Sequence, residues 1–150
     1  MGVGGVVVHE GHVLLIKRGK EPLLGRWVVP GGTVELGESL EDALVREMEE
    51  ETAVRVRPLA ILTVFDRIDK DRGRVRYHYV IVDYLCEYLG GDARAASDAV
   101  DVAWVAHEDL GAFDLPSKAL EVVEEAFRRS RRAQRADTLP ASRGGRILLK

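Results

Sequence analysis

PGGTVELGESLEDALVREMEEETAV, residues 30–54, is the stretch that decides the fold of this chain. Its first part is rich in glycine, and its second part, from Ser39 to about Ala53, has the spacing of a helix. Ser39 is a suitable N-cap residue, and Asp42 stands at the third helical position, close to a capping-box arrangement. The stretch therefore predicts a glycine-rich loop that leads directly into a helix.

The core-facing stripe of this predicted helix contains carboxylates. At about 100° per residue, one face gathers the apolar residues Leu40, Ala43, Leu44 and Met48. Glu51 falls between the directions of two core leucines, and Glu47 and Glu50 lie on or beside the same stripe. The opposite half of the helix carries Glu41, Asp42, Val45, Arg46 and Glu49.

Carboxylates at this spacing need a positive partner. They repel one another along the helix, and partial burial raises the cost. Arg46 can reach Glu50, but a divalent cation such as Mg²⁺ or Mn²⁺ fits better, because it prefers several oxygen ligands and phosphate substrates. The alternative is a solvated acidic helix end, which the helix dipole disfavours. The glycine-rich loop before a helix N-terminus supports an anion-binding role.

The same stretch closely resembles the Nudix box, the motif of the Nudix hydrolase family. The matching positions are Gly32, Glu38, Arg46-Glu47, the aliphatic Met48, Glu50-Glu51 and the aliphatic Val54. One position departs from the motif, since Ala53 stands where the family has its last glycine. A looser resemblance extends from Gly4 to about Ala126.

The resemblance implies an α/β fold, an α/β/α sandwich with a central mixed sheet. It also implies Mg²⁺- or Mn²⁺-dependent hydrolysis of a nucleoside diphosphate linked to another moiety. Carried onto this sequence, it implies that Glu47, Glu50 and Glu51 bind the metal, with the Gly31 carbonyl as a further ligand. Arg46 would orient a glutamate, and Gly32 and Glu38 would be structural, Glu38 through a salt bridge. The general base is left open among Asp98, Asp101 and Glu108.

The strands and loops around the box supply candidate substrate-binding residues. Arg18, Arg26 and Arg67 are candidates to meet phosphates, and Phe65, Tyr77 and Tyr79 are candidates to stack on a base; the alternative is ordinary strand surface and core. We slightly favour ADP-ribose or a similar nucleotide-sugar. A nucleoside triphosphate, oxidised or normal, and a catalytically idle nucleotide-binding module remain alternatives.

The remaining sequence predicts a strand-rich protein with a second main helix. Strands are expected at Val3–Val8 and His12–Lys17 as a hairpin, and at Trp27–Val29, Arg55–Ile68, Val75–Tyr88 and Val100–Val105. The second helix is expected from Ser117 to about Gln134, with Leu120, Val123, Ala126 and Phe127 on one stripe. Many strands and two main helices suggest a layered α/β protein.

Composition fits one globular domain. The chain has 150 residues, 46% hydrophobic and 31% charged, which excludes a collagenous or wholly disordered protein. Cys86 is the only cysteine, so no internal disulfide and no cysteine-based zinc site can form, and we expect a cytoplasmic location.

The first residues lack the basic region of a signal peptide. The apolar run Tyr79–Cys86 contains Asp83 and is too short to span a membrane.

The charge is divided unevenly along the chain. Arg128–Lys150 contains eight Lys or Arg and one Asp, although the net charge of the whole chain is −3. We interpret the arginine cluster as a solvated helix end, favoured by the helix dipole; binding to a polyanion is the alternative. We therefore expect a Nudix domain over 1–135 and a basic tail over 136–150, with a small nucleotide as partner and no nucleic acid or membrane. A homodimer is left open.

Overall fold

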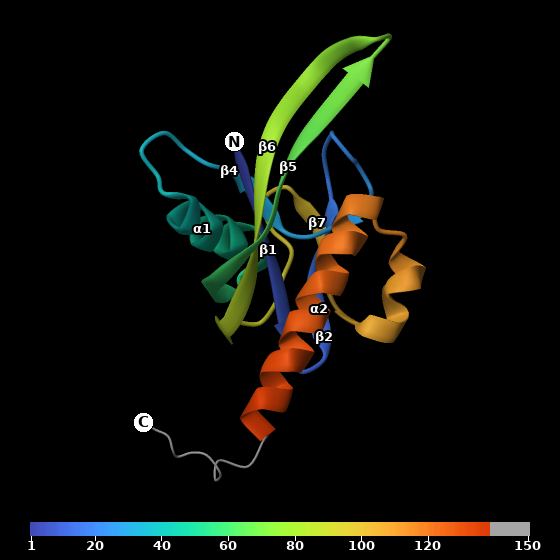
Figure 1. The fold of residues 1–150 in the computed structure, drawn as a ribbon. Coiled ribbons are helices and arrows are strands. Elements are labelled where there is room, and N and C mark those ends of the chain that lie inside the picture. Colours follow the sequence, from blue (N-terminus) through green and yellow to red (C-terminus); the bar gives the residue numbers. More distant parts are fainter. Residues whose placement is uncertain (139–150) are drawn as a thin grey trace.

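The chain folds into a mixed sheet with helices on both sides (Figure 1). The computed structural model describes residues 1–138. The helices are α1 (Leu40–Thr52), α2 (Ser117–Thr138) and the 3₁₀ helix η1 (His107–Phe113). The strands are β1 (Gly2–His9), β2 (His12–Arg18), β3 (Trp27–Val28), β4 (Gly31–Thr33), β5 (Arg55–Asp71), β6 (Arg74–Gly90) and β7 (Ala99–Ala106). The predicted sandwich is confirmed.

Strand β1 lies at the centre and is covered on both faces. It pairs in parallel with β6 and antiparallel with β2, within the order β3-β2-β1-β6-β5, and β4 also pairs with β1, outside this order. Val7 packs in the cluster that contains Leu44 and Met48 of α1. Val6 points the other way, into the cluster that contains Val123 of α2. Because neighbouring residues of a strand face opposite sides, β1 joins the two layers of core.

Two hairpins are closed by tight turns. Glu10 and Gly11 both have positive φ, at 50° and 76°, between β1 and β2. Arg72 and Gly73 likewise have φ of 52° and 79° between β5 and β6. Two successive residues of this conformation suit the right-handed twist of paired strands. The strands of the second hairpin extend further toward this turn than the predicted Arg55–Ile68 and Val75–Tyr88, and its end projects from the body (Figure 1).

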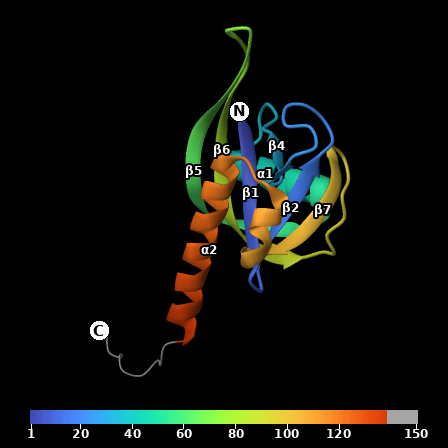
Figure 2. The ribbon, with the colours of Figure 1, turned by 90° about the vertical axis from the view of Figure 1, so that its right-hand side faces the viewer.

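The second helix differs from its prediction in extent and in its buried stripe. It runs to Thr138, so its last residues enter the segment expected as a basic tail; the rest of that tail lies outside the described residues. Leu120 is 38% exposed, and the prediction that it belongs to the core stripe is wrong. The residues that face the sheet are Ala119, Val122, Val123, Ala126 and Phe127, which form a regular helical stripe. Figure 2 shows α2 lying along the sheet.

None of the helices within residues 1–138 has the length and apolar character needed to cross a membrane.

Candidate functional site

Helix α1 begins and ends with its backbone groups satisfied. Ser39 Oγ accepts the N–H of Asp42 at 3.0 Å, as predicted. At the other end, Ala53 is left-handed at φ 62° and caps the helix through its N–H to the Glu49 carbonyl. The segment before β7 supplies two further donors, from Arg94 N–H to Thr52 O and from Ala96 N–H to Glu51 O. This segment therefore lies across the C-terminal end of α1.

Glu51 is buried, as the helical wheel predicted. It is 4% exposed, and its Oε1 accepts a hydrogen bond from the Gly31 N–H at 2.9 Å. Burial raises the pKa of Glu51 to about 7; the nearby carboxylates Glu47 and Asp98 act in the same direction, and the Gly31 hydrogen bond opposes them. Glu51 therefore lies in surroundings that disfavour its negative charge.

Glu47 packs against the glycine-rich loop. Its side chain is 15% exposed, and a Cβ atom on Gly32 would overlap its carboxylate. At Gly31, a Cβ atom would stand 2.1 Å from the Val3 carbonyl oxygen. Burial also raises the pKa of Glu47, with Glu50 and Asp98 adding to the effect against the opposing charge of Arg46. Both glycines are thus required by close approach, one to a strand and one to the carboxylate.

Arg46 ties the loop to the helix. Its Nε and Nη2 donate to the two oxygens of Glu38, at 2.6 and 2.9 Å, and Nη2 also donates to the Thr33 carbonyl at 3.0 Å. The Arg46 hydrogen bonds are the main cause that lowers the pKa of Glu38 to about 2. Arg46 stood on the half of the helix that was expected to be solvated, but the loop covers it, and its side chain is only 25% exposed.

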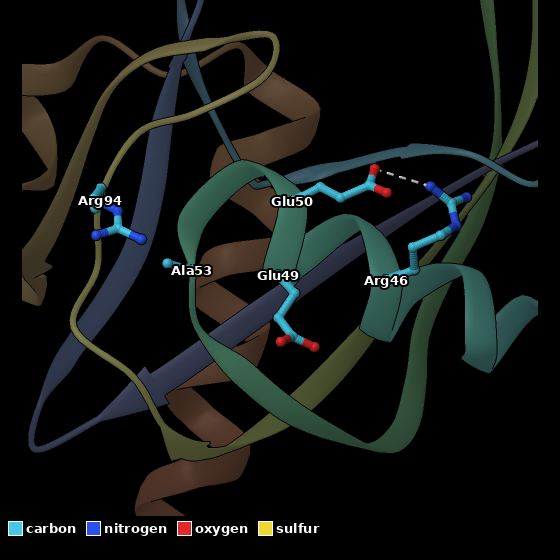
Figure 3. Close-up of a pocket in the computed structure, with 5 residues that line it drawn as sticks. All are labelled: Arg46, Glu49, Glu50, Ala53 and Arg94. Atoms are coloured by element: carbon cyan, nitrogen blue, oxygen red, sulfur yellow. Dashed lines mark hydrogen bonds and ion pairs between the residues drawn. The ribbon is translucent and has the colours of Figure 1, made fainter.

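Glu50 stands at the solvent edge of the acidic group. Its side chain is half exposed and accepts a hydrogen bond from Arg46 Nη1 at 3.1 Å. Figure 3 shows this pair together with Glu49, whose carboxylate points away from it. The residues drawn line a shallow hollow of about 630 Å³ on the outer side of α1: Arg46, Glu49, Glu50, Ala53 and Arg94. Glu50 is therefore the carboxylate of the three that is open to the solvent.

The acidic group fits a divalent cation in charge and in donor type. Glu47 and Glu51 carry raised pKa values, and each is further raised by Asp98, so the group holds more negative charge than its surroundings favour. Carboxylate oxygens are the ligands that Mg²⁺ and Mn²⁺ prefer. Among residues 1–138, however, no three acidic, histidine or cysteine side chains are already gathered at ligating distance. Glu50 would have to leave Arg46, and Glu51 to leave Gly31, to meet one ion.

Gly31 contacts the acidic group through its N–H, which donates to Glu51. The role expected of its carbonyl as a metal ligand stays a prediction.

One of the predicted arginines lies near the acidic group, and a second lies near the first. Arg18, at the end of β2, is close enough to Glu51 to favour its ionised form, and its Nε donates to the Pro22 carbonyl at 2.6 Å. Burial, with the charge of Arg18, lowers the pKa of Arg67. The Arg67 guanidinium makes no hydrogen bond or ion pair within residues 1–138, and the nearby charge of Asp83 favours its protonated form. Two neighbouring guanidinium groups are suited to a phosphate group.

The other predicted substrate residues are spread more widely. Arg26 Nη2 donates to the Asp114 carbonyl at 3.0 Å, which fixes it beside the start of α2. The Phe65 ring lies under Lys118 Nζ, 5.2 Å from the ring centroid. Tyr77 stacks on Tyr79 with 5.9 Å between centroids, on the projecting hairpin. The structure does not bring Tyr77 into contact with the acidic group.

The three candidate general bases lie at different distances from the acidic group. Asp98 influences the pKa values of Glu47 and Glu51 and forms an ion pair with Lys20 at 2.8 Å. Asp101 accepts the Val102 N–H at 2.8 Å and is exposed. Glu108 follows the end of β7 that pairs with His12, opposite the end near Arg18. Asp98 is therefore the candidate that the fold places with the acidic group.

Sequence reasoning missed Asp83 and Lys118. Asp83, on β6, is 3% exposed, and burial raises its pKa to about 6, opposed by the charges of Arg67 and Lys118. Its oxygen lies beside Gly4, where a Cβ atom would stand 2.2 Å away. The signal was a lone acid within the apolar run of Val80–Cys86.

Comparison with known proteins identifies the family. The model of the NUDIX domain matches residues 1–127. The chain belongs to the NUDIX domain family. Ala53 replaces the last glycine of the Nudix box. It nevertheless adopts the left-handed backbone conformation that favours glycine, with φ 62°. The loop–helix unit just described is the Nudix box of this chain.

Relatives and solved structures agree with this assignment. An ADP-ribose pyrophosphatase of Methanocaldococcus jannaschii is 35% identical over 66% of this chain, which spans 57% of that relative's length. A MutT NUDIX hydrolase from Burkholderia pseudomallei has a TM-score of 0.71 at 34% identity, covering 82% of this chain and 94% of the other. The NUDIX domain of Shewanella oneidensis NrtR, solved with ADP ribose, has a TM-score of 0.69 at 27% identity and covers 86% of each chain.

Proposed function

We propose that this Nudix chain is a metal-dependent pyrophosphohydrolase that cleaves a nucleoside diphosphate linked to another moiety. The observation that carries the proposal is the position of Glu51, buried beside Glu47 and Asp98 and next to Arg18. A carboxylate is kept there at a cost in free energy, since its pKa is raised to about 7. Perturbed acids beside a potential phosphate site are typical of catalytic centres.

Each side chain has a defined part in this proposal. Glu47, Glu50 and Glu51 would hold Mg²⁺ or Mn²⁺, which supplies charge neutralisation of the diphosphate and activation of water. Arg18 and Arg67 would bind phosphate oxygens, and Arg46 with Glu38 would keep α1 fixed against its loop. Asp98, held by Lys20, would accept the proton of the attacking water.

ADP-ribose, or a similar nucleotide-sugar, is the favoured substrate. The archaeal relative is named for ADP-ribose hydrolysis, and the Shewanella domain was solved with that molecule. Phe65, partly buried beside Lys118, would stack on the base. Arg26 and Tyr77 are weaker candidates, because Arg26 is engaged with Asp114 and Tyr77 lies on the projecting hairpin. A nucleoside triphosphate is the second candidate, supported by the MutT-named neighbour.

A panel of nucleotides tests the proposal. Purified protein with Mg²⁺ or Mn²⁺ is given ADP-ribose, nucleotide-sugars and nucleoside triphosphates, and AMP, orthophosphate and pyrophosphate are measured. ADP-ribose plus water should give AMP and ribose 5-phosphate, whereas a triphosphate would give a monophosphate and pyrophosphate. Stabilisation by metal without turnover of any nucleotide would instead support an idle binding module.

The remaining features of the proposal concern the setting of the enzyme. The Nudix domain would occupy residues 1–135, with a basic tail over 136–150 and no role in nucleic-acid binding. The single thiol, Cys86, is buried, and we place the enzyme in the reducing cytoplasm on that ground.

A further inference from the structure

The hairpin of β5 and β6 exposes an unusual amount of apolar surface. Of the thirteen large hydrophobic side chains exposed within residues 1–138, eight lie on these two strands. They are Leu59, Ile61, Val64, Ile68, Val75, Tyr77, Val80 and Leu89. Scattered single residues of this kind are normal, but such a concentration on one element marks a contact surface.

Strand β5 is also an unprotected sheet edge. Among residues 1–138 it pairs with β6 alone, so one side of its backbone carries N–H and C=O groups with no strand beside them. Pro58, which has no N–H, suits an edge position. Beyond Pro58, the seven residues Leu59–Phe65 carry no charge. Native proteins usually protect a long apolar edge with charges or a covering element.

The charges of β5 indicate which partner fits this edge. Arg55 and Arg57 stand at the start of the strand, and near its end the three acids Asp66, Asp69 and Asp71 outnumber the two bases Arg67 and Lys70. Two copies of β5 in antiparallel pairing place the start of one strand opposite the end of the other. With Thr63 at the centre, Arg57 comes opposite Asp69. A parallel arrangement would instead place like charges together.

We propose that a second copy of this chain pairs with β5 in antiparallel orientation, about a two-fold axis near Thr63. The two sheets then become continuous across the dimer, with Ile61 opposite the partner's Phe65 and Val64 opposite the partner's Leu62. Such a contact is self-complementary and closes after two copies, as a two-fold interface requires. Helix α2 does not block it, since α2 packs on a face of the sheet, against Leu62.

The mass of the protein in solution tests this proposal without any substrate. The wild-type chain of 16.6 kDa should have twice that mass by light scattering. Val64→Lys places a charge in the centre of the contact and should give a monomer with an unchanged circular dichroism spectrum. Val100→Lys, at a side chain 63% exposed on β7, is the matched control and should stay dimeric. A monomeric wild type, or a dimeric Val64→Lys, would overturn the proposal.

Cross-linking then tests the position of the axis. Thr63→Cys should form a disulfide between copies on mild oxidation, because a residue at a two-fold axis faces itself. Cys86 is buried and should not interfere. A cysteine introduced in place of Val100 should give no linked dimer. Linkage through Val100→Cys but not Thr63→Cys would show that the copies meet elsewhere.

Discussion

Glu47 lies so close to Gly32 that a Cβ atom added to the glycine would stand 1.6 Å from Glu47 Oε2 and 2.2 Å from its carboxyl carbon. The glycine at this position is therefore explained by the carboxylate that it accommodates. Gly32 in the loop and Glu47 in the helix are thus in direct contact, although they are fifteen positions apart in the Nudix box.

Replacing Gly32 with alanine should displace the Glu47 carboxylate and leave the fold in place. The atoms that collide belong to the flexible end of a side chain, so the backbone need not move. We expect metal-dependent stabilisation to weaken and turnover to fall by about tenfold or more, measured by thermal melting with and without Mg²⁺ and by hydrolysis rates. Gly111→Ala is the control, because nothing lies within 4 Å of its added Cβ. Equal effects of both substitutions would contradict the explanation.

Replacing Glu51 or Glu50 with glutamine should separate metal binding from stability. The amide oxygen introduced by Glu51→Gln can still accept the Gly31 N–H, so without metal this variant should be as stable as the wild type or more stable. The loss of the Glu50 pair with Arg46 should cost less than about 1 kcal/mol, because Glu50 is half exposed. In both variants stabilisation by Mg²⁺ should shrink and turnover should fall by orders of magnitude.

Glu49→Gln is the internal control for these variants, since Glu49 is exposed and its carboxylate points away from Glu50 (Figure 3). Unchanged activity in Glu50→Gln and Glu51→Gln would refute the catalytic proposal. Equal losses in Glu49→Gln and Glu51→Gln would refute the distinction between the two faces of α1.

Replacing Ala53 with glycine should stabilise the protein. Ala53 has φ 62°, a conformation that costs an alanine about 1 kcal/mol and a glycine almost nothing. Part of this gain is offset by the greater freedom of glycine in the unfolded chain. The melting temperature should rise by a few degrees with kcat unchanged. A fall in the melting temperature would show that the methyl group of Ala53 contributes more by packing than the strain costs.

Asp83 should make the stability of the protein decrease as pH rises through the acid range. Its pKa in the fold, about 6, lies above the ordinary 3.8, so ionisation is disfavoured in the folded state. Its contribution to the free energy of unfolding is greatest below about pH 4, declines between about pH 4 and 6, and is constant above that, with a total of up to roughly 3 kcal/mol. Urea titrations of the wild type and Asp83→Asn at several pH values isolate the contribution of Asp83 to the free energy of unfolding. Parallel curves for the two proteins would contradict the burial argument.

Truncation after Arg135 should leave fold and turnover largely intact. The buried residues of α2 end at Phe127, and residues 131–137 are exposed. The melting temperature and the number of copies per particle in solution should match those of the full chain. Much earlier melting, or a change of oligomeric state, would show that the tail is structural.

The local elements were predictable because short-range patterns specify them. Ser39 and Asp42 indicated the start of α1, and the helical wheel placed Glu51 inside. The hairpin at Glu10-Gly11 followed from its flanking β-branched runs.

The remaining contacts depend on segments that are distant in the sequence. Nothing near Arg46 reveals that Glu38 and the Thr33 carbonyl cover it. The proximity of Asp98 to the acidic group follows from two backbone hydrogen bonds across the end of α1. Leu120 was misplaced because helical periodicity alone admits more than one stripe, and the sheet selects the one that contains Val122.

The parallel pairing of β1 with β6 determines when this molecule can fold during its synthesis. Gly2 lies beside Ile81, and Val7 lies beside Cys86. Strand β1 therefore cannot complete its pairing until β6 has been synthesised. Until then, β1 is an apolar strand with only β2 and β4 to hold it. The β5–β6 hairpin, which needs only local contacts, can form first and offer β1 its edge. A nascent chain that ends before β6 should therefore remain dependent on chaperones, and the Nudix box should become ordered only after most of the sheet has emerged from the ribosome.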